Sequence, residues 1–179
     1  MRKKIILFFT CFVLIFSMIS VTTDISAKTA KRNFMKNPKK VYTYQSAKGF
    51  KQSIKAHSTS SKKKQRQTVW LYLNQENTHG LNEQQTSKYY SISYSGEEIR
   101  ITRTPKVGTK IYSLYYGKDK LYEGKVISTR AKVKTKYKTF KNCVVVKTKT
   151  EKNYYADGYG IVKRVDNKGK VIEQLIKVK

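Results

Sequence analysis

The chain has 179 residues, of which 39 are Lys or Arg and 11 are Asp or Glu, giving a formal net charge of +28 at pH 7. This length suits one domain with a sizeable core, and the charge excludes an acidic protein and favours anionic partners. Two His and two Cys leave little material for a metal site or a disulfide framework.

Residues 1–27 have the pattern of a secretory signal peptide. Three basic residues precede an apolar run from Ile5 to Phe16, and small residues end at Ala27. The run is shorter than the roughly 20 residues of a membrane span. Cys11 lacks the small residues that precede a lipoprotein cleavage site. We expect cleavage after Ala27, with uncleaved anchoring as the alternative, and a secreted protein that stays associated with the cell envelope.

The mature chain is expected to have two parts, a basic flexible lead at 28–40 and a single antiparallel β domain at 41–179. Loss of the signal peptide removes three basic residues and one acidic residue, which lowers the net charge from +28 to +26. Only Cys143 remains, so no intramolecular disulfide can form. Secretion without disulfides suits a Gram-positive cell envelope.

Beyond residue 40 the sequence predicts strands. Runs of Val, Ile, Tyr and Thr alternate with polar residues at a period of two, as half-buried strands do. About ten strands are expected, at 41–46, 50–56, 68–74, 89–95, 97–103, 110–116, 122–135, 139–150, 159–166 and 170–178. Short Gly-bearing turns between them favour an antiparallel meander. Two polar stretches without alternation, 57–67 and 75–87, are predicted to be loops, and the first carries Lys62, Lys63 and Lys64.

The segment 125–149 predicts a hairpin that turns at Lys136 and Tyr137. Its apolar residues fix the register, because they must share one face of the sheet. The opposite face then gathers six cations, namely Arg130, Lys132, Lys134, Lys141, Lys147 and Lys149. Such a strip repels itself unless an anion lies against it. The strip, together with the basic loop, is therefore a candidate polyanion site; the alternative is a face that only keeps the protein soluble.

A second hairpin is predicted within "KNYYADGYGIVKRV", residues 152–165. Asp157-Gly158 between apolar strands is a strong hairpin signal, and Gly160 marks a bulge or a close backbone approach. No helical pattern follows that could build a phosphate cradle. We interpret these three residues as structural.

The segments "TPKVGTKIYSL", "KTFKNCVVVK" and "YYADGYGIVKRV" resemble the ending of secreted and lipoprotein domains of Gram-positive bacteria. In those domains a "Phe-Lys-Asn-Cys/Val-Val" strand precedes a "Tyr-Tyr-Ala-Pro-Gly-Val-Gly-Leu-Val-Lys" hairpin. The likeness covers about residues 89–179. The chain departs from it at Asp157, where proline is usual, at Tyr112, where Trp is usual, and at "KYK", 136–138. The resemblance implies an open, strongly curved antiparallel sheet or half-barrel, with no assigned activity.

Catalytic chemistry has no local support. His57 and His79 lie in polar stretches without a nearby pair of carboxylates, and Glu97 and Glu98 point to opposite faces of a strand. Cys143 is a candidate nucleophile only if the basic strip lowers its pKa; a lone thiol in a Val-rich strand is more often a packing residue. We therefore expect no enzyme, no metal site and no cofactor.

The remaining functional signals are charge and the 14 tyrosines. Some tyrosines could stack on sugars or bases, whereas Tyr90, Tyr94 and Trp70 are expected in the core. We expect a non-catalytic envelope protein, retained on an anionic wall polymer or an anionic lipid surface, with nucleic acid bound only non-specifically. The alternatives are docking to another secreted protein and action as a cationic membrane-active factor.

Overall fold

A computed structural model describes residues 30–73, 80–94, 96–115 and 119–179. Regular structure within these ranges consists of twelve strands. They are β1 (Val41–Ser46), β2 (Lys51–Lys62), β3 (Gln65–Tyr72), β4 (Gly80–Thr86), β5 (Tyr89–Tyr94), β6 (Glu97–Thr102), β7 (Lys110–Tyr115), β8 (Asp119–Lys134), β9 (Thr139–Thr148), β10 (Glu151–Ala156), β11 (Gly160–Asp166) and β12 (Val171–Val178). The predicted all-β antiparallel architecture is confirmed.

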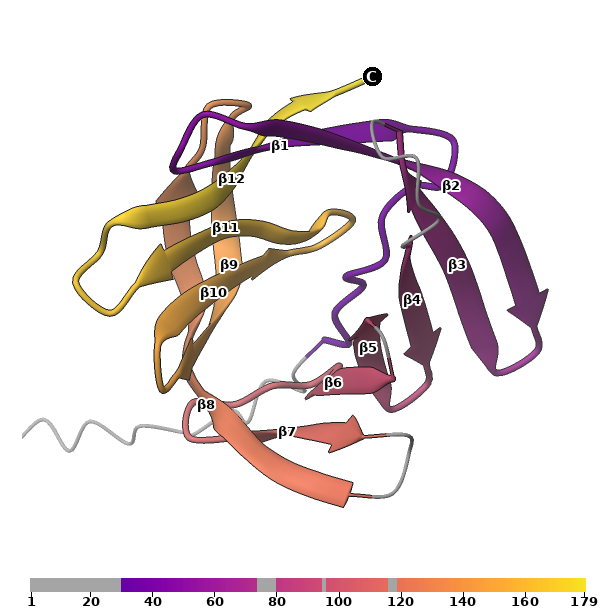
Figure 1. Ribbon diagram of the computed structural model, residues 1–179. Coiled ribbons are helices and arrows are strands. Elements are labelled where there is room, and N and C mark those ends of the chain that lie inside the picture. The colour runs from indigo at the N-terminus through magenta and orange to yellow at the C-terminus, as the bar shows by residue number, and fades with distance from the viewer. Residues whose placement is uncertain (1–29, 74–79, 95, 116–118) are drawn as a thin grey trace, which may run out of the picture.

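The sheet closes into a barrel, whereas the sequence predicted an open, strongly curved sheet or half-barrel. Consecutive strands pair antiparallel, and β1 also pairs with β12, for example Tyr42 with Val178 (Figure 1). The prediction of an open sheet was wrong because closure depends on a pairing between the first and last strands. Local alternation predicts each strand but says nothing about such a distant partner. Closure leaves the sheet without a free edge.

Both stretches predicted to be loops contain strands. The first, 57–67, forms the outer part of the β2–β3 hairpin, with its turn at Lys63 and Lys64. Side chains there are exposed on both faces, so no apolar alternation marks the strand. The second stretch contains β4, in which Leu81, Glu83 and Gln85 are buried in alternation. Two of these three inward residues are polar, so the strand shows no alternation of apolar and polar residues in the sequence.

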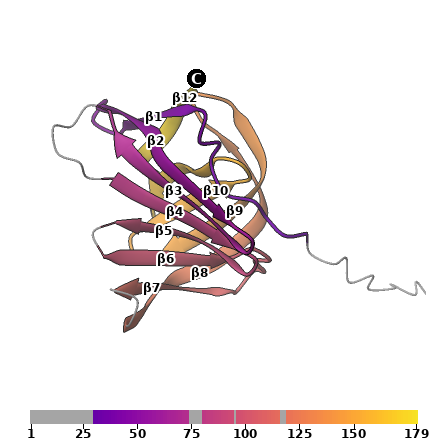
Figure 2. The same cartoon turned by 90° about the vertical axis from the view of Figure 1, so that its right-hand side faces the viewer.

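The stretch expected to be a flexible lead enters the barrel at its middle: Phe34, Met35 and Lys36 are buried, whereas residues 37–40 are exposed before β1 begins (Figures 1 and 2). Phe34 is fully buried, and its ring packs against Tyr90 of β5 and Tyr155 of β10, with ring centroids 5.5 and 6.0 Å away. Its backbone N–H donates to the Gln85 side chain at 3.2 Å. The lead therefore forms part of the core, and the inward polar residues of β4 satisfy its backbone.

The turn between β10 and β11 also projects into the barrel (Figure 1). Its Gly158 N–H donates to the Asn33 carbonyl of the lead at 2.6 Å. Gly158 and Gly160 both have positive φ, 75° and 62°. A Cβ on Gly160 would lie 2.8 Å from the Lys36 Nζ and 2.8 Å from the Tyr90 hydroxyl. The glycine thus permits a close backbone approach as well as a turn.

The barrel interior holds Trp70, Tyr42 and Tyr90 among its largest buried side chains. Trp70 and Tyr90 are thus core residues, as predicted. The signal-peptide prediction lies outside the described residues. No helix in the described ranges has the length and apolar character needed to cross a bilayer.

Candidate functional site

A row of four lysines crosses the outside of the barrel. Lys110 of β7 pairs with Lys125 of β8, Lys125 with Lys147 of β9, and Lys147 with Lys152 of β10. Neighbouring strands lie about 4.8 Å apart, so this lysine row is about 14 Å long. The next residues along three of these strands, Ile111, Val126 and Val146, are buried, which places the lysines on the outer face. Like charges directly opposite one another are destabilising.

The six cations of the predicted strip are all exposed, but the structure places them in two groups. Arg130, Lys132, Lys134 and Lys141 lie near the tip of the β8–β9 hairpin. Lys147 and Lys149 lie at the other end of β9, where Lys147 is part of the lysine row. Lys141 and Lys147 are six residues apart along the strand, or about 20 Å. Buried Cys143 and Val145 separate the two groups.

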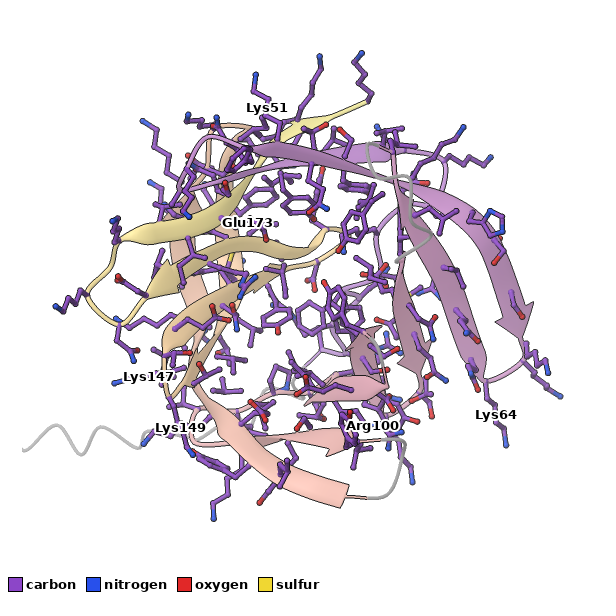
Figure 3. All side chains as sticks on the ribbon, viewed as in Figure 1. Lys51, Lys64, Arg100, Lys147, Lys149 and Glu173 are labelled. Carbon is purple, nitrogen blue, oxygen red and sulfur yellow. The ribbon has the colours of Figure 1, made fainter. Side chains whose placement is uncertain are left out.

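The three lysines of the predicted basic loop, Lys62, Lys63 and Lys64, sit at the tip of the β2–β3 hairpin and are exposed. They border a shallow hollow together with Arg66 and Arg103. Lys64 projects on the opposite side of the barrel from Lys147 and Lys149 (Figure 3). A single ligand of small size cannot contact both regions.

Few acidic groups neutralise these lysines. Lys36 is the one lysine among the five ion pairs found within the described ranges; the other partners are Arg32, Arg100 and Arg164. The carboxylates of Glu83, Glu151 and Glu173 face the barrel interior, where they meet Lys36 and Arg164. These three carboxylates therefore lie inside the barrel, and the exterior is strongly cationic.

A cavity of about 410 Å³ occupies the barrel end opposite the entry of the lead. Its walls come from β1 to β6 and β10 to β12. Four tyrosines line it, Tyr44, Tyr72, Tyr94 and Tyr155, together with aliphatic residues such as Ile92. Tyr94, expected in the core, is 43% exposed and stands at the mouth. The cavity therefore opens to solvent.

One side of the cavity is polar. Arg164 of β11 donates to both carboxylate oxygens of Glu151, at 3.3 and 2.9 Å, and lies 3.9 Å from a carboxylate oxygen of Glu173. Burial raises the pKa of Glu173, against the lowering effect of Arg164. Asn153 of β10 also lines the cavity; it is 6% exposed, and its Oδ1 has no hydrogen-bond partner in the described structure.

Lys36, which lines the cavity, belongs to a buried polar cluster around Glu83. The carboxylate accepts hydrogen bonds from the Lys36 Nζ and backbone N–H, each at 3.1 Å, from the Trp70 indole at 3.1 Å, and from the Tyr90 hydroxyl at 2.5 Å. Burial, followed by the Glu83 charge, holds the pKa of Tyr90 well above its usual range. The Glu83 carboxylate is thus fully engaged by four donors, and the Lys36 Nζ that borders the cavity is paired with it.

Of the residues considered for catalysis, His57 is exposed on β2, and His79 lies outside the described residues. Cys143 is fully buried, and burial raises the pKa of its thiol to about 11, which disfavours the thiolate. Glu98 pairs with Arg100 at 2.8 Å. Within the described ranges, no group of three or more His, Cys, Asp or Glu side chains could hold a metal ion.

Sequence reasoning found the exposed cations of β8 and β9 but missed the lysine row and the cavity. Lys110, Lys125 and Lys152 become neighbours of Lys147 only through the register of four strands. The cavity residues are distributed over nine strands, so no local motif marks them. The one available signal was polar residues at inward positions of apolar strands, as with Asn153 and Arg164.

No protein-family model and no curated protein matches this chain. Among solved structures, a protein of Bacteroides fragilis described as exported, with a YmcC-like fold, is 11% identical; the match covers 84% of this chain and 100% of the other, with a TM-score of 0.54. A protein of Parabacteroides distasonis described as a lipoprotein is 11% identical over 84% and 99%, with a TM-score of 0.49. At this identity the first match shows the fold alone. It does not support the Gram-positive assignment or the specific terminal motif.

Proposed function

We propose that this protein is an exported, non-catalytic binding protein, retained at the cell envelope by an anionic wall polymer. The observation that carries the proposal is the lysine row, Lys110, Lys125, Lys147 and Lys152, on four adjacent strands. Four opposed lysines mildly destabilise a bare sheet, and an anion that lies across them relieves this repulsion.

The length and charge of the lysine row suit a linear polyanion as the partner. The row is about 14 Å long, so several phosphates of an extended polymer can lie along it at once. Lys149 and the exposed cations at the β8–β9 tip extend the positive field beyond the row. A net charge of +28 attracts anionic polymers from a distance, and the contacts at the row then hold them.

The test measures salt dependence of binding, with a phosphate-bearing wall polymer and with duplex DNA as a reference polyanion. Each neutralised DNA phosphate adds roughly 0.9 to the slope of log affinity against log salt concentration. Replacement of Lys110, Lys125 and Lys147 by Gln should lower that slope by about two to three units. The matched control, Lys62, Lys63 and Lys64 to Gln, removes the same charge from the opposite side of the barrel.

A third variant, Arg130, Lys132 and Lys134 to Gln, tests the other group of the predicted strip. Equal losses in all three variants would reject the lysine row as a site and leave a generally cationic surface. Absence of salt-dependent binding by the parent protein would reject polyanion retention. Docking to another secreted protein would then be the leading function.

A further inference from the structure

We propose that the cavity at the barrel mouth binds a small amphipathic amine. The apolar body of the ligand lies against the tyrosine and isoleucine walls, and its amino group meets the Asn153 side chain and the carboxylates of Glu151 and Glu173. This site is separate from the lysine row, because the cavity lies inside the barrel and the row lies outside.

The size and lining of the cavity are those of a small-molecule site. Its volume of about 410 Å³ lies in the range of roughly 300–1,000 Å³ that is typical of ligand pockets. Protein cores otherwise pack without voids of this size. The lining is slightly more apolar than polar, with tyrosine and aliphatic side chains beside charged and amide groups, and Tyr94 at the mouth gives access from solvent.

The Asn153 side chain indicates which polar group a ligand of the cavity carries. The residue lines the cavity, and its Oδ1 is buried behind the cavity surface without a hydrogen-bond partner in the described structure. A buried acceptor without a partner is costly, so native proteins satisfy nearly all of them. An amide oxygen only accepts hydrogen bonds. A ligand group that reaches this oxygen can satisfy it only by donating an N–H or O–H.

The charges around the cavity favour a cation as that donor. Glu151 and Glu173 share a single guanidinium, that of Arg164, while Lys36 is already engaged by Glu83. One carboxylate is thus left without a full counter-charge. Burial raises the pKa of Glu173, Arg164 lowers it, and the neighbouring Glu151 charge raises it further. An anionic ligand would add to the repulsion.

The aromatic walls favour an ammonium group as well. Tyrosine rings attract cations through their faces, and four tyrosines surround the cavity. The net charge of +28 repels polycations before they reach the mouth. A ligand with one amino group and an apolar body avoids most of this repulsion and gains affinity from burial of its apolar part.

The first experiment compares octylamine, octanol and octanoate by isothermal titration calorimetry with the mature protein. The three probes share one apolar body and differ in charge. Octylamine should bind at least about tenfold more tightly than octanol, as expected for a hydrogen bond that involves charged groups, and octanoate should bind most weakly. Equal affinities for octylamine and octanol, tightest binding of octanoate, or no binding of any probe would overturn the proposal.

The second experiment uses Asn153→Leu, which keeps the side-chain size. Affinity for octylamine should fall about tenfold or more, whereas the melting temperature should rise, because an unpartnered polar group is replaced by an apolar one. Unchanged affinity or a lower melting temperature would contradict the assignment.

Two further variants locate the charge. Glu173→Gln should remove most of the preference for octylamine over octanol. Lys168→Gln, in the exposed turn between β11 and β12, should leave the affinity for octylamine unchanged. A preference that survives Glu173→Gln, or an equal loss in Lys168→Gln, would mean that the amine binds elsewhere. Because polyanion binding uses different residues, its failure leaves these results unaffected.

Discussion

At the scale of single residues, Gly160 joins the inserted turn to the polar cluster on Glu83. Its backbone lies so close to Lys36 and Tyr90 that no side chain fits between them. A buried ion pair gains stability only when its hydrogen-bonding groups are well placed, so the contact at Gly160 affects more than the turn. Other turn glycines lack such neighbours; Gly169 also has a positive φ, 90°, but open space around it.

We predict that Gly160→Ala lowers the free energy of unfolding by about 3 kcal/mol or more. Backbone strain at positive φ accounts for about 1–2 kcal/mol, and displacement of Lys36 or Tyr90 for the rest. Gly169→Ala is the matched control, since it incurs the backbone strain alone. Urea unfolding of both variants gives the comparison. Equal losses would mean that the close approach at Gly160 has no energetic consequence.

At the scale of elements, the lead and β4 depend on each other. The Phe34 and Lys36 backbone N–H groups donate to Gln85 and Glu83, the inward polar side chains of β4. Arg32 adds hydrogen bonds to the Asn142 carbonyl of β9 and, through its backbone N–H, to the Arg103 carbonyl. The lead thus acts as a central element that the strands surround.

We predict that Phe34→Ala lowers the free energy of unfolding by about 3–5 kcal/mol, as for a buried aromatic residue. Phe50→Ala is the control, because Phe50 is 73% exposed and exposed substitutions usually change stability by less than about 0.5 kcal/mol. Thermal or urea unfolding separates the two cases. A Phe34 variant as stable as the Phe50 variant would show that the lead lies outside the barrel.

The same pair of elements shows how far the sequence predicts the fold. Strands such as β5 and β6 were predicted because their inward residues, including Ile92 and Ile101, are apolar. Hydrophobic alternation could not identify β4, whose inward residues include Glu83 and Gln85. These residues face inward to bind the lead, and the lead looked flexible because its own sequence is basic. The missed strand β4 and the prediction of a flexible lead therefore have one cause, the contact between these two segments, which neither sequence shows alone.

The candidate sites follow a similar rule. Exposure of the lysines on β8 and β9 was predictable, because apolar residues alternate with them along each strand. Their neighbours Lys110 and Lys152 depend on cross-strand register, and bulges shift that register between β7 and β8 and between β8 and β9. The cavity requires closure of the barrel and partial filling by the lead, and neither was predicted.

At the scale of the whole molecule, closure separates the charges. Acidic side chains such as Glu151 and Glu173 lie inside with Arg164, and the lysines cover the outside. In an open sheet, both the acidic side chains and the lysines would face solvent. The closed form gives one molecule two surfaces of different character, a cationic exterior and an aromatic, weakly acidic cavity.

We predict that cysteines placed at Thr43 and Lys177 form a disulfide upon oxidation. These residues are directly paired between β1 and β12, and Cα atoms of paired antiparallel residues lie at a distance that a disulfide can span. Intact-mass analysis and non-reducing electrophoresis would detect the bond. Cys143 is buried and should not compete.

The control for closure combines Thr43→Cys with Lys125→Cys, which lies on the distant strand β8. This pair should stay reduced under the same conditions. If the Thr43 and Lys177 pair also stays reduced in the folded protein, β1 and β12 are not joined and the sheet is open.

The enclosed lead has a consequence for how the chain folds. Its Asn33 N–H donates to the Asp157 side chain, 124 residues away in sequence, and the barrel seam joins β1 to β12. Such non-local contacts form late, because the chain entropy lost in closing long loops is recovered only when the contacts are complete. We therefore expect slow folding, on a timescale of milliseconds to seconds or longer. Until the seam forms, β1 and β12 present unpaired edges, and the charged exterior limits association between partly folded copies.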